Sequence, residues 1–327
     1  MILLWGPGGD GPLVAVAGVL SARDTAVRVF DQHDVERIRA DVTVDANGAR
    51  GTLSGAPGEV DLAQLTAAYL RPYAACEAPA VRAAGPGSEL WRHAAEVDAA
   101  VSAWAELTPV RVVGRPSPRW GLTSKPRQAP VIERCGFAFP PTLVTTDPDA
   151  VRAFAERHGR LISKGLSSRR SIVRLLDEAA EASLDTVAAC PTQFQAWVPG
   201  QDVRVHVVAG VVFATAIDSE AIDYRYAGRE GVERRMTAAT LPDDVADGCR
   251  RLARALELDF AGIDLRRTPD GRWYCFEANP APGFTFFSDA DGQPVAEAVA
   301  DLLASEAAPV AGEVPGPLSL DIGALAR

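Results

Sequence analysis

Two acidic residues and an asparagine on a short apolar hairpin have the types and spacing to bind a divalent cation. The segment FAGIDLRRTPDGRWYCFEANP contains the turn sequence TPDG between two alternating runs, and such residues favour tight turns. With the turn centred between its proline and its aspartate, Asp264 lies opposite Cys275 and diagonal to Glu277, within about 7–8 Å on the same face. Asn279 faces the same way, two residues further on. Mg²⁺ prefers hard oxygen ligands together with phosphate oxygens, so we predict a Mg²⁺ site that holds phosphate.

An ordinary solvated face is the alternative interpretation of these acidic residues. Against it, they alternate with the large apolar residues Phe260, Ile263, Trp273 and Phe276. The segment FEANPAPGF is also too apolar for a turn that contacts only water. We therefore favour the cation site.

Lysine occurs at only two positions, Lys125 and Lys164, and every other basic residue is arginine. A compact ammonium and a planar guanidinium are not interchangeable where one point charge must meet phosphate oxygens. The two lysines are therefore candidates for a shared phosphate site.

A glycine-rich loop near the N-terminus suggests a different chemistry. The sequence GPGGDG follows an apolar run, and Asp31 ends the next one. Such loops can bind a pyrophosphate while the acid binds a ribose hydroxyl, so an NAD(P)-binding oxidoreductase that uses Gly6–Gly11 is an alternative function. Against it, Pro7 and Pro12 remove N–H donors from the loop, and the hypothesis explains neither the lysines nor the hairpin.

The composition of the 327-residue chain disfavours several classes of partner. Because the net charge is −10, we expect neither a nucleic acid nor an anionic membrane as the main partner. The five scattered cysteines, without a C-x-x-C pair, suit a reducing cytoplasm and indicate neither disulfides nor a zinc site. No run approaches about twenty apolar residues, so we expect no membrane span and no signal peptide, and a cytoplasmic location.

The elements that must position these residues predict an α/β protein of three lobes and a tail. Residues 1–115 alternate apolar runs and helical patterns, as in βαβ units with a parallel sheet, and GRPSPRW at 114–120 is the best domain boundary. Residues 121–198 hold a helix that begins at Asp147-Pro148 and strands in RLISK, SIVRLL and TQFQAWV. Residues 199–305 hold longer strands, a helix near 243–256, the hairpin and a closing helix. We expect residues 306–327 to be disordered.

Five motifs in this order and spacing resemble those of the ATP-grasp carboxylate–amine ligases: TSKP, LISK, FQAWVPGQDVRV, GIDLR and FEANP. The resemblance is greatest to the glutamate-ligase-like branch that includes the graspetide (microviridin-type) synthetases. The segments AAYLRPY and GFAFPPTLVTTDPDAV extend it over nearly the whole chain. It implies the ATP-grasp fold, with an N-terminal pre-ATP-grasp lobe followed by central and C-terminal α+β lobes, and it implies ATP and Mg²⁺ as cofactors.

The resemblance also implies roles for the charged residues. Lys125 matches a lysine near the α-phosphate of ATP, and Lys164 matches one near the α- and β-phosphates. Arg204 and Arg266 match catalytic arginines that face phosphate or an acyl phosphate. The residues of the hairpin match the metal ligands: Asp264, Glu277 and Asn279.

Further nucleotide contacts are implied for the segment QFQAWV, which matches the hinge that holds adenine. They are the side chain of Gln195, the backbone around Ala196, Trp197 and Val198, Asp202 at the ribose hydroxyls, and Ser167 in the loop after the second lysine. That loop, KGLSSRRS, has one glycine where many relatives are glycine-rich, and Ser124 stands where many have asparagine.

Substrate contacts are implied for two regions. The segment DSEAIDYRYAGREG resembles the acceptor-binding region of relatives, with Asp223, Tyr224 and Arg225 as candidates, and Arg225 can hold a carboxylate bidentately. Arg71, at the end of a strand, is a candidate for the rim of the cleft. An exposed polar loop is the alternative for the first region.

The predicted activity is that of an ATP- and Mg²⁺-dependent ligase forming ADP and phosphate. The enzyme activates a carboxylate as an acyl phosphate and couples it to an amine or a hydroxyl. Its substrate is a peptide or an amino acid, and a precursor peptide is one candidate partner. A homodimer is compatible with this activity. A small-molecule amide ligase of the glutathione-synthetase type is an alternative. A non-catalytic ATP-binding protein is another, disfavoured by the intact metal ligands.

Overall fold

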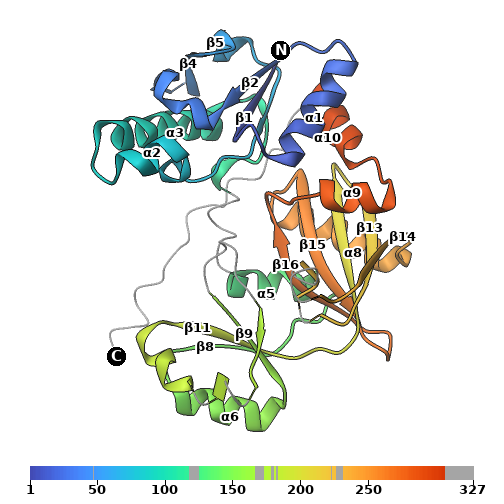
Figure 1. The fold of residues 1–327 in the computed structure, drawn as a ribbon. Helices are drawn as coiled ribbons and strands as arrows, with labels where there is room; N and C mark the ends of the chain where they lie inside the picture. The colour runs from blue at the N-terminus through green and yellow to red at the C-terminus, as the bar shows by residue number, and fades with distance from the viewer. Residues whose placement is uncertain are drawn as a thin grey trace, which may run out of the picture.

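Three lobes, each built around its own main β-sheet, make up the protein in Figure 1. This computed structural model describes residues 1–46, 48–117, 125–165, 173–177, 180–181, 183–221, 223–225 and 231–305. The tail predicted at 306–327 lies outside the described residues. No helix in these described ranges is long and apolar enough to span a membrane.

The N-terminal lobe contains the predicted parallel sheet, in the strand order β2-β1-β6-β7. Its apolar runs form the strands, and Asp10 caps the helix after the first strand by accepting from the N–H of Leu13 at 2.9 Å. The elements are β1 (Ile2–Gly6), α1 (Gly11–Ala22), β2 (Val27–Asp31), β6 (Ala67–Leu70) and β7 (Arg111–Val113).

A second, antiparallel sheet lies between β2 and β6 in the chain and was not predicted. Its strands are β3 (Arg39–Asp45), β4 (Gly48–Gly55) and β5 (Gly58–Asp61). It packs on α3 (Glu89–Leu107), whose N-terminus is capped by Ser88. The short helices of this lobe are η1 (Gln32–Arg37), η2 (Leu62–Gln64), η3 (Ala75–Glu77) and α2 (Pro79–Ala84).

The central lobe is a small antiparallel sheet in the order β10-β9-β11-β8, covered on one face by α6 (Pro148–His158). The predicted helix start is correct, because Asp147 caps α6 and accepts from the N–H of Asp149 at 2.9 Å. The other elements are β8 (Thr142–Thr145), β9 (Leu161–Gly165), β10 (Arg174–Leu175), η4 (Leu184–Ala189) and β11 (Thr192–Ala196).

The C-terminal lobe is a five-stranded antiparallel sheet in the order β14-β13-β12-β15-β16. One face packs on α8 (Asp243–Ala255) and α5 (Lys125–Arg134), so the helix that starts at Lys125 contacts this lobe. The strands are β12 (Gln201–Val208), β13 (Val211–Ser219), β14 (Arg234–Ala239), β15 (Phe260–Arg267) and β16 (Trp273–Asn279). Two further helices follow them: α9 (Thr285–Asp291) and α10 (Val295–Ala304).

The N-terminal and C-terminal lobes share a hydrophobic core. Helix α10 packs beside α1 against the parallel sheet (Figure 1), and Leu4 and Tyr69 of that sheet lie in one cluster with Phe260 and Val299. The core of the central lobe, around Phe194, is separate. The terminal lobes therefore form one packed unit, to which the central lobe is joined at the hinge.

Candidate active site

The two predicted metal-binding carboxylates lie directly opposite each other on β15 and β16, where Asp264 pairs with Glu277. The predicted register, with Cys275 opposite Asp264, was wrong. Cys275 pairs with Leu265 because β16 holds one additional residue, Phe276, at a bulge. Directly opposite residues have Cβ atoms about 4.5–5.5 Å apart, so the carboxylates are closer than the diagonal register implied.

The third predicted ligand, Asn279, pairs with Gly262 on the same face. Its Oδ1 accepts from the N–H of Ala281 at 2.9 Å, which fixes the amide at the end of β16. Within the described part of the chain, no cluster of three or more His, Cys, Asp and Glu side chains could hold a metal ion. Two carboxylates and an amide fit Mg²⁺, which takes few protein ligands and completes its shell with phosphate oxygens and water.

Arg204 lies across this face of the sheet, with its Nη1 donating to Asp264 Oδ1 at 2.6 Å. Burial is the largest single influence on Arg204 and opposes its charge, but Asp264, Tyr224 and Glu277 together raise the pKa of the guanidinium. Burial, with Arg204 second, lowers the pKa of His206 to about 3, so its imidazole is neutral near pH 7. Arg204 is therefore a fixed positive charge beside the predicted metal ligand Asp264.

Gly262 makes room for this arginine. A Cβ at position 262 would overlap the Arg204 guanidinium and lie 2.5 Å from Pro282 Cβ. We expect Gly262→Ala to lower the free energy of unfolding by about 1–3 kcal/mol, as overpacking does. Denaturant unfolding measures this, with Gly18→Ala as control because nothing lies within 4 Å of a Cβ there. Equal stability of Gly262→Ala and the parent would contradict the close packing of Arg204.

Asp202 and Arg266 form the neighbouring cross-strand ion pair, with Nε–Oδ1 at 2.8 Å and Nη2–Oδ2 at 2.9 Å. Arg266 also donates from Nη1 to the carbonyl of Val198 at 2.7 Å and stacks 4.9 Å from the Trp197 ring. Asp202, expected at the ribose, and Arg266, expected at phosphate, therefore bind each other, and Arg266 also binds the hinge.

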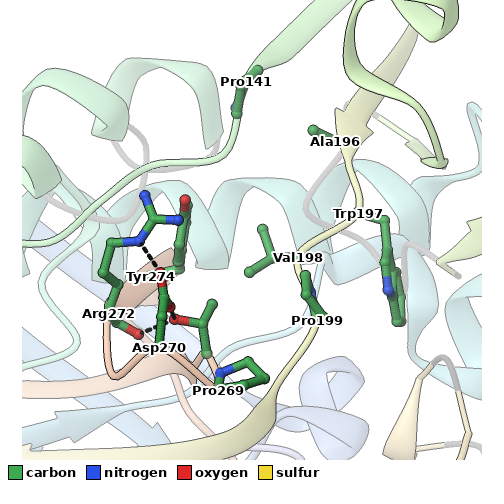
Figure 2. Close-up of a pocket in the computed structure, with 10 residues that line it drawn as sticks. Pro141, Ala196, Trp197, Val198, Pro199, Pro269, Asp270, Arg272 and Tyr274 are labelled. Atoms are coloured by element: carbon green, nitrogen blue, oxygen red, sulfur yellow. Dashed lines mark hydrogen bonds and ion pairs between the residues drawn. The ribbon is translucent and has the colours of Figure 1, made fainter.

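The hinge residues border a cavity of about 310 Å³. Figure 2 shows Ala196, Trp197 and Val198 along the hinge strand and Arg272 and Tyr274 on the other side of the pocket. The Ala196 N–H donates to Pro141 O at 2.9 Å and that of Trp197 to Arg160 O at 2.8 Å. These bonds fix the hinge backbone at the mouth of the pocket.

Lys164 is buried on β9, and its Nζ donates to Gln195 Oε1 at 3.2 Å. The Gln195 amide in turn donates from Nε2 to Thr142 Oγ1 at 2.9 Å. The predicted phosphate lysine and the predicted hinge side chain are therefore in direct contact. Lys125 is the first residue of α5, but its side chain lies outside what the structure describes. Ser167 and Ser124 lie outside the described residues.

Two glutamines near these lysines were missed. Gln193, directly opposite Lys164, is fully buried, and neither atom of its amide has a hydrogen-bond partner among the described residues. Gln128 donates from Nε2 to Ala278 O at 3.2 Å and accepts from Ala278 N at 2.8 Å, which connects α5 to β16, the strand of two predicted metal ligands. The alternation in TQFQ could have indicated Gln193, which shares a face with Gln195; nothing in the sequence indicates the Gln128 contact.

The acceptor-region candidates lie near the predicted metal ligand Asp264. Tyr224 packs edge to face against Phe287, with ring centroids 6.4 Å apart, and the Phe287 ring centroid also lies 5.6 Å from the Arg204 guanidinium. Burial and, second, the charge of Asp264 raise the pKa of the Tyr224 phenol. Arg225 does bind a carboxylate bidentately, but in this structure it is that of Asp223, at 2.8 and 2.6 Å.

The glycine loop of the alternative hypothesis is bound by its own acid. Asp31 Oδ1 accepts from the Gly8 N–H at 2.7 Å and from the His33 N–H at 2.9 Å. A Cβ at Gly8 would overlap the Asp31 carboxylate. An N–H donor that a pyrophosphate would use is therefore already engaged by an anion.

Arg71, the candidate for the cleft rim, is buried and forms an ion pair with Asp10, with Nε–Oδ1 at 2.6 Å. It also donates from Nη1 to Pro282 O at 2.9 Å. Arg71 therefore contacts the segment that follows β16 and its predicted metal ligands.

Comparison with known proteins relates the whole chain to solved ligase structures. No family model matches the chain, and no curated protein matches it. The ATP-grasp ligase PsnB, in complex with a phosphomimetic variant of its minimal precursor, Mg and ADP, is 27% identical, with a TM-score of 0.78 over 93% of this chain and 98% of PsnB.

Two other ligases share the fold at lower identity. The RiPP-associated ATP-grasp ligase of Chryseobacterium gregarium, in complex with ADP and a leader and core peptide, is 21% identical, with a TM-score of 0.78 over 94% of this chain and 97% of the ligase. The macrocyclase MdnC of Microcystis aeruginosa MRC, bound to its precursor peptide MdnA, is 20% identical, with a TM-score of 0.77 over 93% of this chain and 100% of MdnC. The resemblance inferred from the motifs is thus confirmed, and the chain has the fold of the ATP-grasp ligases, in the form found in PsnB and MdnC.

Proposed function

We propose that this protein is an ATP- and Mg²⁺-dependent ligase that joins a carboxylate to an amine or a hydroxyl within a peptide, with ADP and phosphate as the other products. The single observation that carries the proposal is the shared face of β12, β15 and β16, where Arg204 contacts Asp264 directly opposite Glu277. Similarity to PsnB over 93% of the chain supports a peptide substrate.

The chemistry requires charge stabilisation more than a nucleophilic side chain. A carboxylate oxygen of the substrate attacks the γ-phosphorus of ATP, the bond from that phosphorus to the β,γ-bridging oxygen breaks, and ADP leaves. An amine or hydroxyl of the acceptor then attacks the acyl carbon, loses its proton, and displaces phosphate. Negative charge gathers on phosphoryl oxygens, and fixed cationic groups around them lower the barrier.

The residues of this chain take defined roles in the proposal. Asp264, Glu277 and Asn279 hold Mg²⁺, which when bound neutralises charge on the phosphate oxygens. Arg204, buried and fixed by Asp264, faces the acyl phosphate. Lys164 binds phosphate oxygens.

The remaining contacts select the nucleotide and the acceptor. The hinge from Ala196 to Val198, held by Arg266, contacts adenine. Tyr224, next to the arginine that faces the acyl phosphate, borders the acceptor site.

The test is mass spectrometry of a short peptide that contains Asp or Glu together with Lys, Ser or Thr, incubated with the protein, ATP and Mg²⁺. We expect the loss of one water per bond formed and a matching amount of ADP, with neither when AMPPNP replaces ATP. ADP formation that depends on a free amino acid, with the peptide unchanged, would instead indicate the small-molecule amide ligase. No ADP formation with any carboxylate and acceptor would contradict the proposal.

A further inference from the structure

The turn GPGGDG contributes a buried ion pair to the interface between the terminal lobes. Asp10, at its end, caps α1 and binds Arg71 through both carboxylate oxygens, at 2.6 and 3.2 Å. Both side chains are buried, with 8% exposure for Arg71 and 5% for Asp10. A buried ion pair contributes little to stability by itself, and fixing one arrangement of the chain is its best-attested use.

Arg71 also contacts the C-terminal lobe through its Nη1 amino group. Its Nη1 donates to the carbonyl of Pro282, which is 211 residues away in the chain and three residues after Asn279. The same short segment is held at two further points: the Ala281 N–H donates to Asn279 Oδ1, and Gly283 O lies 3.2 Å from His206 Nε2. The segment that leaves the metal-binding strand is therefore fixed from the N-terminal lobe as well as from its own sheet.

A shift of this segment would reach the metal ligands. Pro282 and Arg204 pack so closely around Gly262 that a Cβ there fits against neither. Arg204 in turn binds Asp264, and the Asn279 amide is fixed by the N–H of Ala281, next to Pro282. Movement of Pro282 would therefore displace one ligand through Arg204 and another through the turn at Asn279.

We propose that Arg71, oriented by Asp10, is a positioning residue for the Mg²⁺ site, acting through the carbonyl of Pro282. This inference rests on the proposed function and adds to it a dependence of the metal site on the N-terminal lobe. It also gives the GPGGDG turn a role without a nucleotide. Partners outside the ligand shell of a metal commonly change its affinity by 10–100-fold.

The test measures the Mg²⁺ concentration that half-saturates the protein in the presence of AMPPNP, from the rise in unfolding temperature, in full-length Arg71→Met. We expect an increase of about tenfold, with unchanged affinity for AMPPNP in EDTA. Arg71→Lys keeps the charge but lacks the planar guanidinium that binds Asp10 through Nε and Nη2 while Nη1 donates to Pro282. We therefore expect its Mg²⁺ midpoint to lie between those of Arg71→Met and the parent. Asp10→Asn keeps a good helix cap but removes the negative charge that binds Arg71. We therefore expect the Mg²⁺ concentration at half-saturation to rise in this variant as well.

The matched control is Arg23→Met, which removes the exposed ion pair between Arg23, the residue that follows α1, and Asp301 of α10. That ion pair joins the same two lobes without contacting β16. We therefore expect Arg23→Met to have the same Mg²⁺ concentration at half-saturation as the parent. A lower unfolding temperature in Arg71→Met with an unchanged Mg²⁺ midpoint would overturn the proposal, as would an equal increase in Arg23→Met. If Arg71→Met does not fold, the proposal is judged by the Mg²⁺ midpoints of Arg71→Lys and Asp10→Asn. Parental midpoints in both of these variants would then overturn it. Absence of Mg²⁺-dependent AMPPNP binding in the parent would refute the proposed function, and the positioning role with it.

Discussion

Glu277→Gln is expected to abolish ADP formation while leaving the fold intact. The amide keeps the size of the side chain but removes the negative charge opposite Asp264, so Mg²⁺ loses one of two anionic ligands. A metal ion contributes several kcal/mol to phosphoryl transfer, and each 1.36 kcal/mol is a factor of ten in rate. We expect a decrease of at least about 100-fold, measured as ADP released with the peptide that the parent modifies.

The control for this variant is Glu297→Gln, the same substitution on the exposed face of α10. It should retain the parental rate, and the unfolding temperatures of both variants should stay near that of the parent. A Glu277→Gln protein that forms ADP at the parental rate would show that this residue does not hold the metal ion.

Lys164→Met is expected to weaken nucleotide binding by at least about tenfold, because hydrogen bonds to charged groups contribute about 1.5–3 kcal/mol. Methionine matches the aliphatic stem and removes only the ammonium that lies against Gln195. Lys164→Arg should not restore binding, since a planar guanidinium does not replace a compact point charge in a buried site. Isothermal titration with AMPPNP and Mg²⁺ measures the dissociation constants.

Arg174→Met is the matched control for the lysine variant. Arg174 is exposed on β10, the strand next to β9, where it pairs with Ser163. Its loss removes one positive charge from the same lobe, so any general electrostatic effect is reproduced. Equal weakening in both variants, or parental binding by Lys164→Met, would be incompatible with a phosphate role for Lys164.

Local patterns in the sequence were sufficient for much of the fold. The helix start at Asp147 and the apolar run before the glycine-rich loop each predict an element that the structure contains. The sheet of β3–β5 was missed because its middle strand, GARGTLSG, is rich in glycine and lacks alternating apolar residues. Residue types alone do not indicate such a strand, because it is stabilised by packing on α3.

The sequence predicted that the candidate site residues share a face, but not their exact arrangement. Alternation placed Asp264 and Glu277 on one face, but a period of two cannot reveal an additional residue such as Phe276, so the register was wrong by that bulge. The pairing of Asp202 with Arg266 depends on which strands are neighbours in the sheet, which local patterns do not specify. The contact of Arg71 with Pro282 joins residues 211 positions apart and needs the complete fold.

Mg²⁺-dependent ATP binding at the hairpin carboxylates is tested most directly by thermal unfolding. The unfolding temperature of the full chain is measured with AMPPNP and Mg²⁺, and in parallel with NAD⁺ and NADP⁺. A ligand at about 100 times its dissociation constant stabilises a protein by about 2.7 kcal/mol. We expect a rise in unfolding temperature with AMPPNP that requires Mg²⁺ and is lost in Asp264→Asn, with each variant compared to its own ligand-free state. A rise in unfolding temperature only with a nicotinamide nucleotide would contradict the proposed ligase. It would instead favour an NAD(P)-binding oxidoreductase that uses the loop at Gly6–Gly11.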